Sequence, residues 1–248
     1  TLFPYTTLFR SSIIILLISC KKENGYEVDC NFEKKKAQND FKYKNYTYTQ
    51  IFGLYDGLEL NSRKELISRL KKYNVKFDSI SVSCIVFENT KYENCYAKEM
   101  NKLLKQKFGK TFFEEQEKLA IKDYVMKNID SIYQYENCDE TSRYPNSTIN
   151  NQFDIIENDY FLKYKTPKNY IEKKEKYYSY TSADFILTKE GKVKDLTIES
   201  SFQNNKNKIF EKQFNQQVKE FVLKTKWIPA KIEGINVNSY YGLTIHYK

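Results

Sequence analysis

The sequence predicts an α+β protein built from two domains. A length of 248 residues suits one large or two modest domains. Apolar residues recur with helical spacing in some segments and alternate in others, and a turn-rich stretch, residues 137–151, separates two such halves. We therefore expect a mixed α/β domain over residues 30–136, a linker over 137–151, and an antiparallel sheet with one long helix over 152–248.

The expected N-terminal domain alternates helices and strands. Its patterns predict strands at residues 46–49 and 80–86, and helices over 32–43, over 63–74 with a cap at Asn61-Ser62, over 95–108 ended by Gly109, and over 113–128. Its carboxylates lie among lysines on helix surfaces, which is typical of solvated faces. We recognise no catalytic chemistry there.

The expected C-terminal domain has the order strand, strand, helix, strand. Residues 183–187 alternate, residues 189–192 form a tight turn, and the broken alternation of residues 193–198 predicts a bulged second strand. Phe210, Phe214, Val218, Phe221 and Val222 form one face of a helix. A final strand places Val237, Tyr241, Leu243, Ile245 and Tyr247 on one face.

Trp227 and Pro229 lie in the segment that ends this helix, and Gly234 turns the chain into the final strand. We expect Trp227 to be buried against Phe210 and Phe214. These are packing roles, and none of the three residues has a catalytic role in this interpretation.

Charge and histidine content exclude several function classes. The formal net charge is +9, but the lysines are spread along the chain without a basic arm, so we expect no nucleic-acid partner. The single histidine is His246, and the cysteines lack zinc-site spacing. We accordingly expect no metal, no cofactor and no enzymatic activity.

The first residues do not resemble natural protein sequence. Residues 1–11, TLFPYTTLFRS, match the in-frame translation of a common sequencing adapter at every position. We interpret them as an artefact and exclude them from the fold. The alternative is a genuine polar and aromatic N-terminus.

An apolar run, residues 13–18, precedes Ser19 and Cys20. It is too short to span a bilayer but fits the end of a signal peptide over residues 12–19. Residues 17–20 resemble the bacterial lipobox, which implies that Cys20 is acylated, that it begins the mature chain, and that residues 20–29 are a tether. The alternative is a buried cysteine at the end of a core strand.

Four further cysteines would then lie in an oxidising compartment. We favour a disulfide between Cys84 and Cys95, because a turn at Asn89-Thr90 would bring the chain back. This leaves Cys30 with Cys138 as the second option. Free buried thiols are the alternative.

Residues 185–247 resemble the C-terminal domain of TonB-type energy transducers. The resemblance rests on the hairpin from Phe185 to Ser200, the helix with Phe210 and Phe214, the Trp227–Ala230 segment, and the pattern from Gly234 to Tyr247. It implies a sheet with a helix across one face that accepts a partner's strand at its edge. The candidates for that contact are Tyr240, Gly242, Thr244 and His246.

The chain departs from that family because it lacks a long Pro-rich spacer. We therefore expect a non-enzymatic lipoprotein similar to those of Bacteroidetes envelopes, anchored in the outer membrane, whose C-terminal domain binds an envelope protein of a TonB-dependent system. A variant energy transducer of a TonB-dependent uptake system is the first alternative. An envelope enzyme that uses the N-terminal domain is the second.

Overall fold

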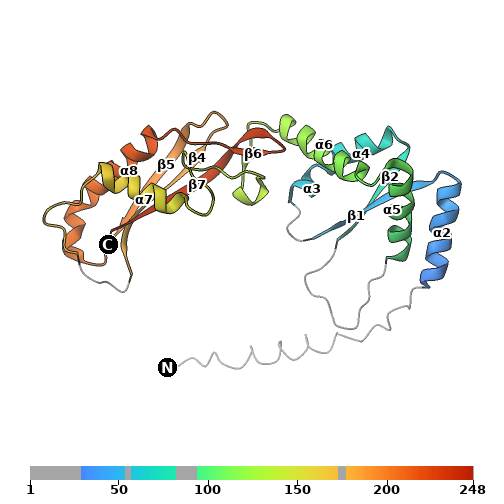
Figure 1. Ribbon diagram of the computed structural model, residues 1–248, viewed down its shortest axis with the longest axis horizontal. Coiled ribbons are helices and arrows are strands. Elements are labelled where there is room, and N and C mark those ends of the chain that lie inside the picture. The colour runs from blue at the N-terminus through green and yellow to red at the C-terminus, as the bar shows by residue number, and fades with distance from the viewer. Residues whose placement is uncertain (1–28, 54–56, 82–93, 173–176, 248) are drawn as a thin grey trace, which may run out of the picture.

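The computed structural model describes residues 29–53, 57–81, 94–172 and 177–247. The chain has an α+β fold, and Figure 1 shows two lobes joined through α6 and the β6–β7 hairpin. The expected adapter, signal peptide and acylated Cys20 lie outside the described residues, as does Cys84. The predictions of the adapter, the signal peptide and the acylation of Cys20 therefore stay predictions.

The N-terminal lobe packs four of its helices around a parallel pair of strands, β1 and β2, which are paired from Tyr46 with Val75 to Phe52 with Ser81. The core contains Leu70, Met100 and Leu104, all with no exposed surface. The elements are α2 (Cys30–Lys42), β1 (Tyr46–Phe52), α3 (Gly57–Asn61), α4 (Arg63–Lys71), β2 (Val75–Ser81), α5 (Cys95–Phe108) and α6 (Phe112–Lys127).

The start of α4 differs from the expected cap. The sequence predicts that Asn61-Ser62 caps this helix, but the Ser62 side chain makes no capping hydrogen bond. Its hydroxyl instead donates to the carbonyl of Glu59 at 3.3 Å. Because the short helix α3 runs almost directly into α4, the Ser62 side chain bonds to α3, while its carbonyl accepts from the N–H of Leu66 at the N-cap position of α4.

A disulfide joins Cys30 to Cys95, with 5.3 Å between their Cα atoms. The expected pair of Cys84 with Cys95 is therefore wrong, and so is the pair of Cys30 with Cys138 that would have remained beside it. Cys30 is the first residue of α2 and Cys95 is the first residue of α5. Because these two helices pack against each other, their first turns bring the sulfur atoms together across 65 residues of sequence.

The C-terminal lobe contains an antiparallel sheet of β7, β4 and β5, with the short β3 parallel to β7. β6 pairs with the first residues of β7. The elements are β3 (Ile132–Tyr133), α7 (Gln152–Lys163), β4 (Ser179–Leu187), β5 (Val193–Ser201), a 3-10 helix (Asn205–Phe210), α8 (Glu211–Lys224), β6 (Ala230–Ile232) and β7 (Ile235–Tyr247).

The predicted order of strand, strand, helix and strand is confirmed by β4, β5, α8 and β7. The predicted bulge is also present, because the pairing of β4 with β5 shifts between Asp184 and Ile186. The extra residue lies in β5, where Asp195 has a φ of 50°. The turn that begins β7 uses Glu233 and Gly234, with φ angles of 47° and 77°, as a two-residue hairpin turn requires.

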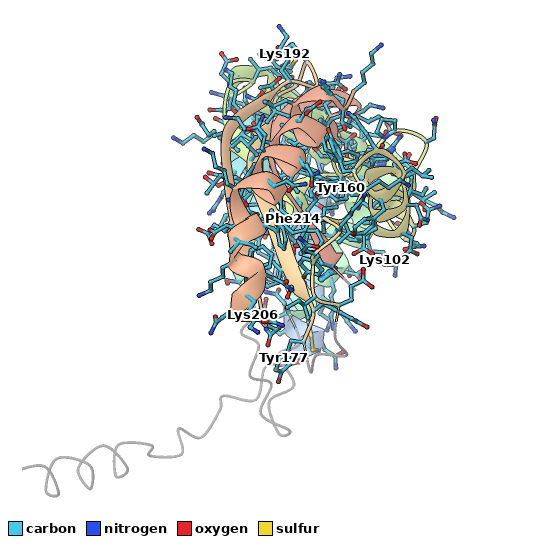
Figure 2. All side chains as sticks on the ribbon, turned by 90° about the vertical axis from the view of Figure 1, so that its left-hand side faces the viewer. Lys102, Tyr160, Tyr177, Lys192, Lys206 and Phe214 are labelled. Carbon is cyan, nitrogen blue, oxygen red and sulfur yellow. A yellow bond between two sulfur atoms is a disulfide. The ribbon has the colours of Figure 1, made fainter. Side chains whose placement is uncertain are left out.

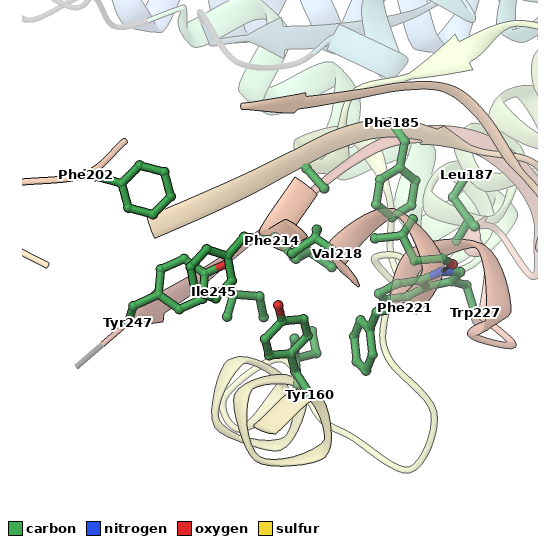
Figure 3. Packing of buried hydrophobic residues seen from close by; sticks show 14 residues of the cluster. Tyr160, Phe185, Leu187, Phe202, Phe214, Val218, Phe221, Trp227, Ile245 and Tyr247 are labelled. Carbon is green, nitrogen blue, oxygen red and sulfur yellow. Dashed lines mark hydrogen bonds between the residues drawn. The ribbon is translucent and has the colours of Figure 1, made fainter. Parts of the chain in front are cut away.

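Trp227 is buried, but its ring does not pack against Phe210 and Phe214 as predicted. Its ring lies 5.4 Å from that of Phe185 and 5.1 Å from that of Tyr241, and its Nε1 donates to the carbonyl of Val222. Phe214 instead stacks on Tyr247 at the other end of the core (Figure 3). Trp227 follows the last turn of α8, whereas Phe214 lies about 15 Å back along the helix axis.

The two lobes share a small hydrophobic cluster. Leu58, Ile121 and Val125 come from the N-terminal lobe and pack with four residues of the sheet, Tyr133, Ala230, Ile232 and Val237. The predicted linker also packs on the C-terminal lobe, since Glu140 bridges to Lys231 and Arg143 to Ile228.

Candidate functional site: the edges of the C-terminal sheet

The four residues expected to contact a partner strand lie on one face of β7. Tyr240 and Gly242 are exposed and Thr244 and His246 are half-buried, whereas Leu243, Ile245 and Tyr247 are buried on the other face. The alternation of β7 thus places these candidates away from the core, as the sequence predicts. Their contact with a partner stays a prediction.

Gly242 leaves room for a carboxylate on the exposed face of the sheet. It pairs across the strands with Asp184. A Cβ atom at position 242 would lie 2.6 Å from Oδ1 of Asp184. The missing side chain at Gly242 therefore lets Asp184 lie across β7.

The edge of β7 away from β4 is partly covered. β3 pairs with Asn238 and Ser239, and Glu157 of α7 accepts hydrogen bonds from the backbone N–H of His246 at 3.2 Å and lies 2.8 Å from its Nδ1. Gln152, at the start of α7, accepts a hydrogen bond from the Tyr241 hydroxyl at 2.8 Å. The helix α7 was not predicted from the sequence, and it covers part of the edge that was expected to accept a partner's strand.

The uncovered part of the β7 edge is the segment from Tyr240 to Thr244. Because the N–H of His246 points away from β4, the alternation of an antiparallel strand directs the backbone groups of Tyr240, Gly242 and Thr244 to the same side. No strand among the described residues pairs with them there. This leaves a short stretch of edge for a partner.

The opposite edge of the sheet is β5, which pairs only with β4 among the described strands. Its unpaired edge is longer than the Tyr240–Thr244 stretch of β7. The register pairs Asp184 with Thr197 and Ser182 with Glu199. Continuing the same alternation, Thr197 and Glu199 direct their backbone groups to β4, and Ile198 and Ser200 direct theirs outward.

A groove of about 570 Å³ runs along this edge, between β5 and α8. Leu196 and Ile198 contribute apolar side chains from the strand, and Ile209, which is 77% exposed, contributes another. The remaining lining residues are polar or charged, namely Lys208, Glu211, Lys212, Asn215, Gln216 and Lys219. In Figure 2, α8 faces the viewer between the labelled residues Lys206 and Lys192.

The charge of the groove is positive. Three lysines line it against one glutamate, and within the described part of the chain none of the three forms an ion pair. From the sequence, only the apolar face of this helix was predicted. The sequence does contain a signal for the positive groove, namely Lys208 and Lys212, four residues apart, with the apolar Ile209 between them.

A second groove, of about 410 Å³, lies where the lobes meet and is mainly acidic, with Glu59, Glu117, Glu136 and Asp139 among its lining residues. Burial, followed by the charges of Asp139 and Glu136, raises the pKa of the Cys138 thiol in this groove to about 11. The thiol is therefore protonated at neutral pH. No cluster that could hold a metal ion occurs in the residues that the structure describes.

Comparison with protein-family models, with curated proteins and with solved structures found no match. The resemblance to the TonB C-terminal domain therefore rests on the sequence pattern. Among the helices of the described segments, none has the length and apolar character needed to cross a membrane.

Proposed function

We propose that this chain is a non-enzymatic, lipid-anchored protein of the bacterial cell envelope, and that its C-terminal lobe binds a protein partner by strand addition. The observation that carries the proposal is the sheet, in which β5 and the Tyr240–Thr244 part of β7 pair with β4 on one side and have no strand partner on the other side among the described residues. Unpaired backbone groups at such edges are the groups that a partner strand satisfies.

The proposed partner is an envelope protein of a TonB-dependent system. The support is the order of β4, β5, α8 and β7, which agrees with the resemblance to the TonB C-terminal domain, together with the lipobox-like residues 17–20. Attachment to the outer membrane through Cys20 would hold the C-terminal lobe near such a partner.

The anchor is tested by labelling. With the natural upstream reading frame restored, the protein should incorporate labelled palmitate in a bacterial host, and Cys20→Ala should lose the label and keep a longer chain. Equal labelling of both forms would exclude the anchor. An upstream frame that encodes an uncleaved membrane helix would instead favour the variant energy transducer.

Partner binding is tested by photocrosslinking in the native bacterium. A photoreactive phenylalanine analogue replaces either Tyr240, which is 47% exposed on β7, or Tyr43, which is 66% exposed at the end of α2. We expect a discrete crosslinked envelope protein from position 240 and none from position 43. Crosslinks from position 43 alone would move the binding site to the N-terminal lobe and contradict the proposal.

A further inference from the structure

The β5 edge combines two features that recognise an extended segment. Ile198 and Ser200 direct their backbone groups outward, and no described strand pairs with them there. The bulge at Asp195 leaves the strand from Leu196 to Ser201 as the regular part of this edge. A strand laid beside it would extend the sheet by its main-chain hydrogen bonds.

The groove beside this edge would contact the side chains of such a strand. Alternate side chains of a strand point to one face of the sheet, so one set of partner side chains would lie against the flank of α8. Ile209 and Ile198 offer apolar contact there, and Lys208, Lys212 and Lys219 offer positive charge. On the face turned to α8, acidic partner side chains complement the lysines, and an apolar one complements Ile209 or Ile198.

We propose that the β5–α8 groove binds an extended acidic segment of another protein, which adds to the sheet as a strand beside β5. The inference rests on the proposed function, because it requires that the C-terminal lobe binds a protein, and it names the site and the chemistry of the ligand. The site differs from the Tyr240–Thr244 edge, which lies at the other side of the sheet.

A second copy of this chain fits the groove less well than an acidic partner. Pairing of two β5 edges about a twofold axis places the same surface patch on both sides. The lysines of one groove would then lie near the lysines of the other, with one glutamate in each to offset them. Like charges brought together across an interface oppose association.

Binding of defined peptides tests the proposal with the full chain. The probe is a fluorescein-labelled peptide of five Glu-Val repeats, and the matched peptide has five Lys-Val repeats. Fluorescence anisotropy should show binding of the acidic peptide that weakens with added salt, because salt screens exposed charges over about 10 Å at 0.1 M. Equal binding of both peptides would overturn the charge requirement.

Charge reversal locates the site. The double variant Lys212→Glu and Lys219→Glu should weaken binding of the acidic peptide at least tenfold. Its control is Lys34→Glu with Lys35→Glu, an equal charge change at exposed positions of α2. Circular dichroism checks that both variants are folded. A similar loss in both would mean attraction to the whole chain and would overturn the assigned site.

An N-methylated form of the acidic peptide tests strand addition, since it keeps every side chain but lacks N–H donors. It should bind at least tenfold more weakly, and undiminished binding would overturn strand addition.

Sedimentation of the chain alone should show a monomer, whereas a dimer dispersed by the Lys212→Glu and Lys219→Glu variant would assign the groove to a second copy. If no peptide binds while Tyr240 still crosslinks a partner, this inference fails and the proposed function stands.

Discussion

The two lobes differ in whether a neighbouring side chain satisfies the backbone groups at the edge of a strand. In the N-terminal lobe, Asn101 of α5 closes the edge of β1, because its side chain accepts from the N–H of Thr49 at 3.0 Å and donates to the carbonyl of Thr49 at 2.7 Å. In the C-terminal lobe no described side chain closes β5 in this way, and a groove runs beside it. Asn101 thus satisfies both backbone groups of one residue of β1, and the lack of such a contact along β5 in the described residues supports the proposed strand addition there.

The lobes also differ in what stabilises them. Both lobes have aromatic contacts in their cores, but among the described residues only the N-terminal lobe also has a disulfide, which links two of its helices. The only tryptophan of the chain, Trp227, lies in the second core. Its fluorescence therefore reports on the C-terminal lobe, while circular dichroism reports on both.

The largest expected effect is that of Trp227→Ala. Replacing a buried tryptophan by alanine costs about 3–5 kcal/mol, and this side chain is only 4% exposed and donates to the carbonyl of Val222. Urea unfolding followed by circular dichroism should show the C-terminal lobe destabilised. Trp227→Phe should lose less. A midpoint for Trp227→Ala equal to that of the parent would contradict this packing.

Removal of the disulfide should act on the other lobe. Replacing both Cys30 and Cys95 by serine is expected to cost about 2–4 kcal/mol, because the unfolded chain gains freedom in the loop between them. The unfolding transition seen by circular dichroism should broaden or divide. The transition seen by Trp227 fluorescence should move less, and an equal shift in both signals would show that the lobes unfold as one unit.

A smaller effect is expected when the side chain that covers β1 is removed. Asn101→Ala leaves the buried backbone groups of Thr49 without their partner, which is expected to cost about 1–3 kcal/mol. Gln216→Ala, in the groove beside β5, is the matched change and should cost less than about 0.5 kcal/mol. Equal losses of stability in the two variants would mean that the contact of Asn101 with Thr49 does not distinguish the edge of β1 from that of β5.

The smallest expected effect is a pH dependence at Glu117 in the N-terminal lobe. Burial raises the pKa of this carboxyl above its usual value, even though it accepts a hydrogen bond from Tyr48 at 2.7 Å. The folded state therefore binds a proton more tightly than the unfolded state, so the free energy of unfolding falls as the pH rises through the raised pKa.

Glu117→Gln should remove that dependence, because the amide oxygen still accepts from Tyr48 and carries no charge. Urea unfolding at pH 4 and pH 7 measures it. The variant should equal the parent at the lower pH and exceed it at the higher pH. A parent that becomes the more stable form as the pH rises would contradict the effect of burial.

Local periodicity was enough to predict some elements from the sequence. The predicted bounds of α5, Cys95–Phe108, are those observed, and the apolar sets of α8 and β7 face the core with Phe210 half-buried. These patterns depend only on residues within one helix or strand. The predicted strand at residues 80–86 instead begins at Val75, and its residues beyond Ser81 lie outside the described residues.

The remaining features depend on contacts between distant residues. The Cys30–Cys95 pair follows from the packing of two helices, which sequence spacing does not reveal. The helix α7 was missed, although Gln152, Ile156 and Tyr160 follow one another at intervals of four and are buried. Because α7 determines how much of the β7 edge is covered, the candidate site could be predicted only in part.

The central claim is that the C-terminal sheet accepts a partner strand. Its most direct test is backbone hydrogen exchange of the full chain with and without the protein crosslinked at position 240. Strand addition should slow exchange at least tenfold at Gly242 and Thr244, or at Ile198 and Ser200 if the β5 groove is used, and should leave Thr49 unchanged. Slowed exchange confined to the N-terminal lobe would contradict the claim.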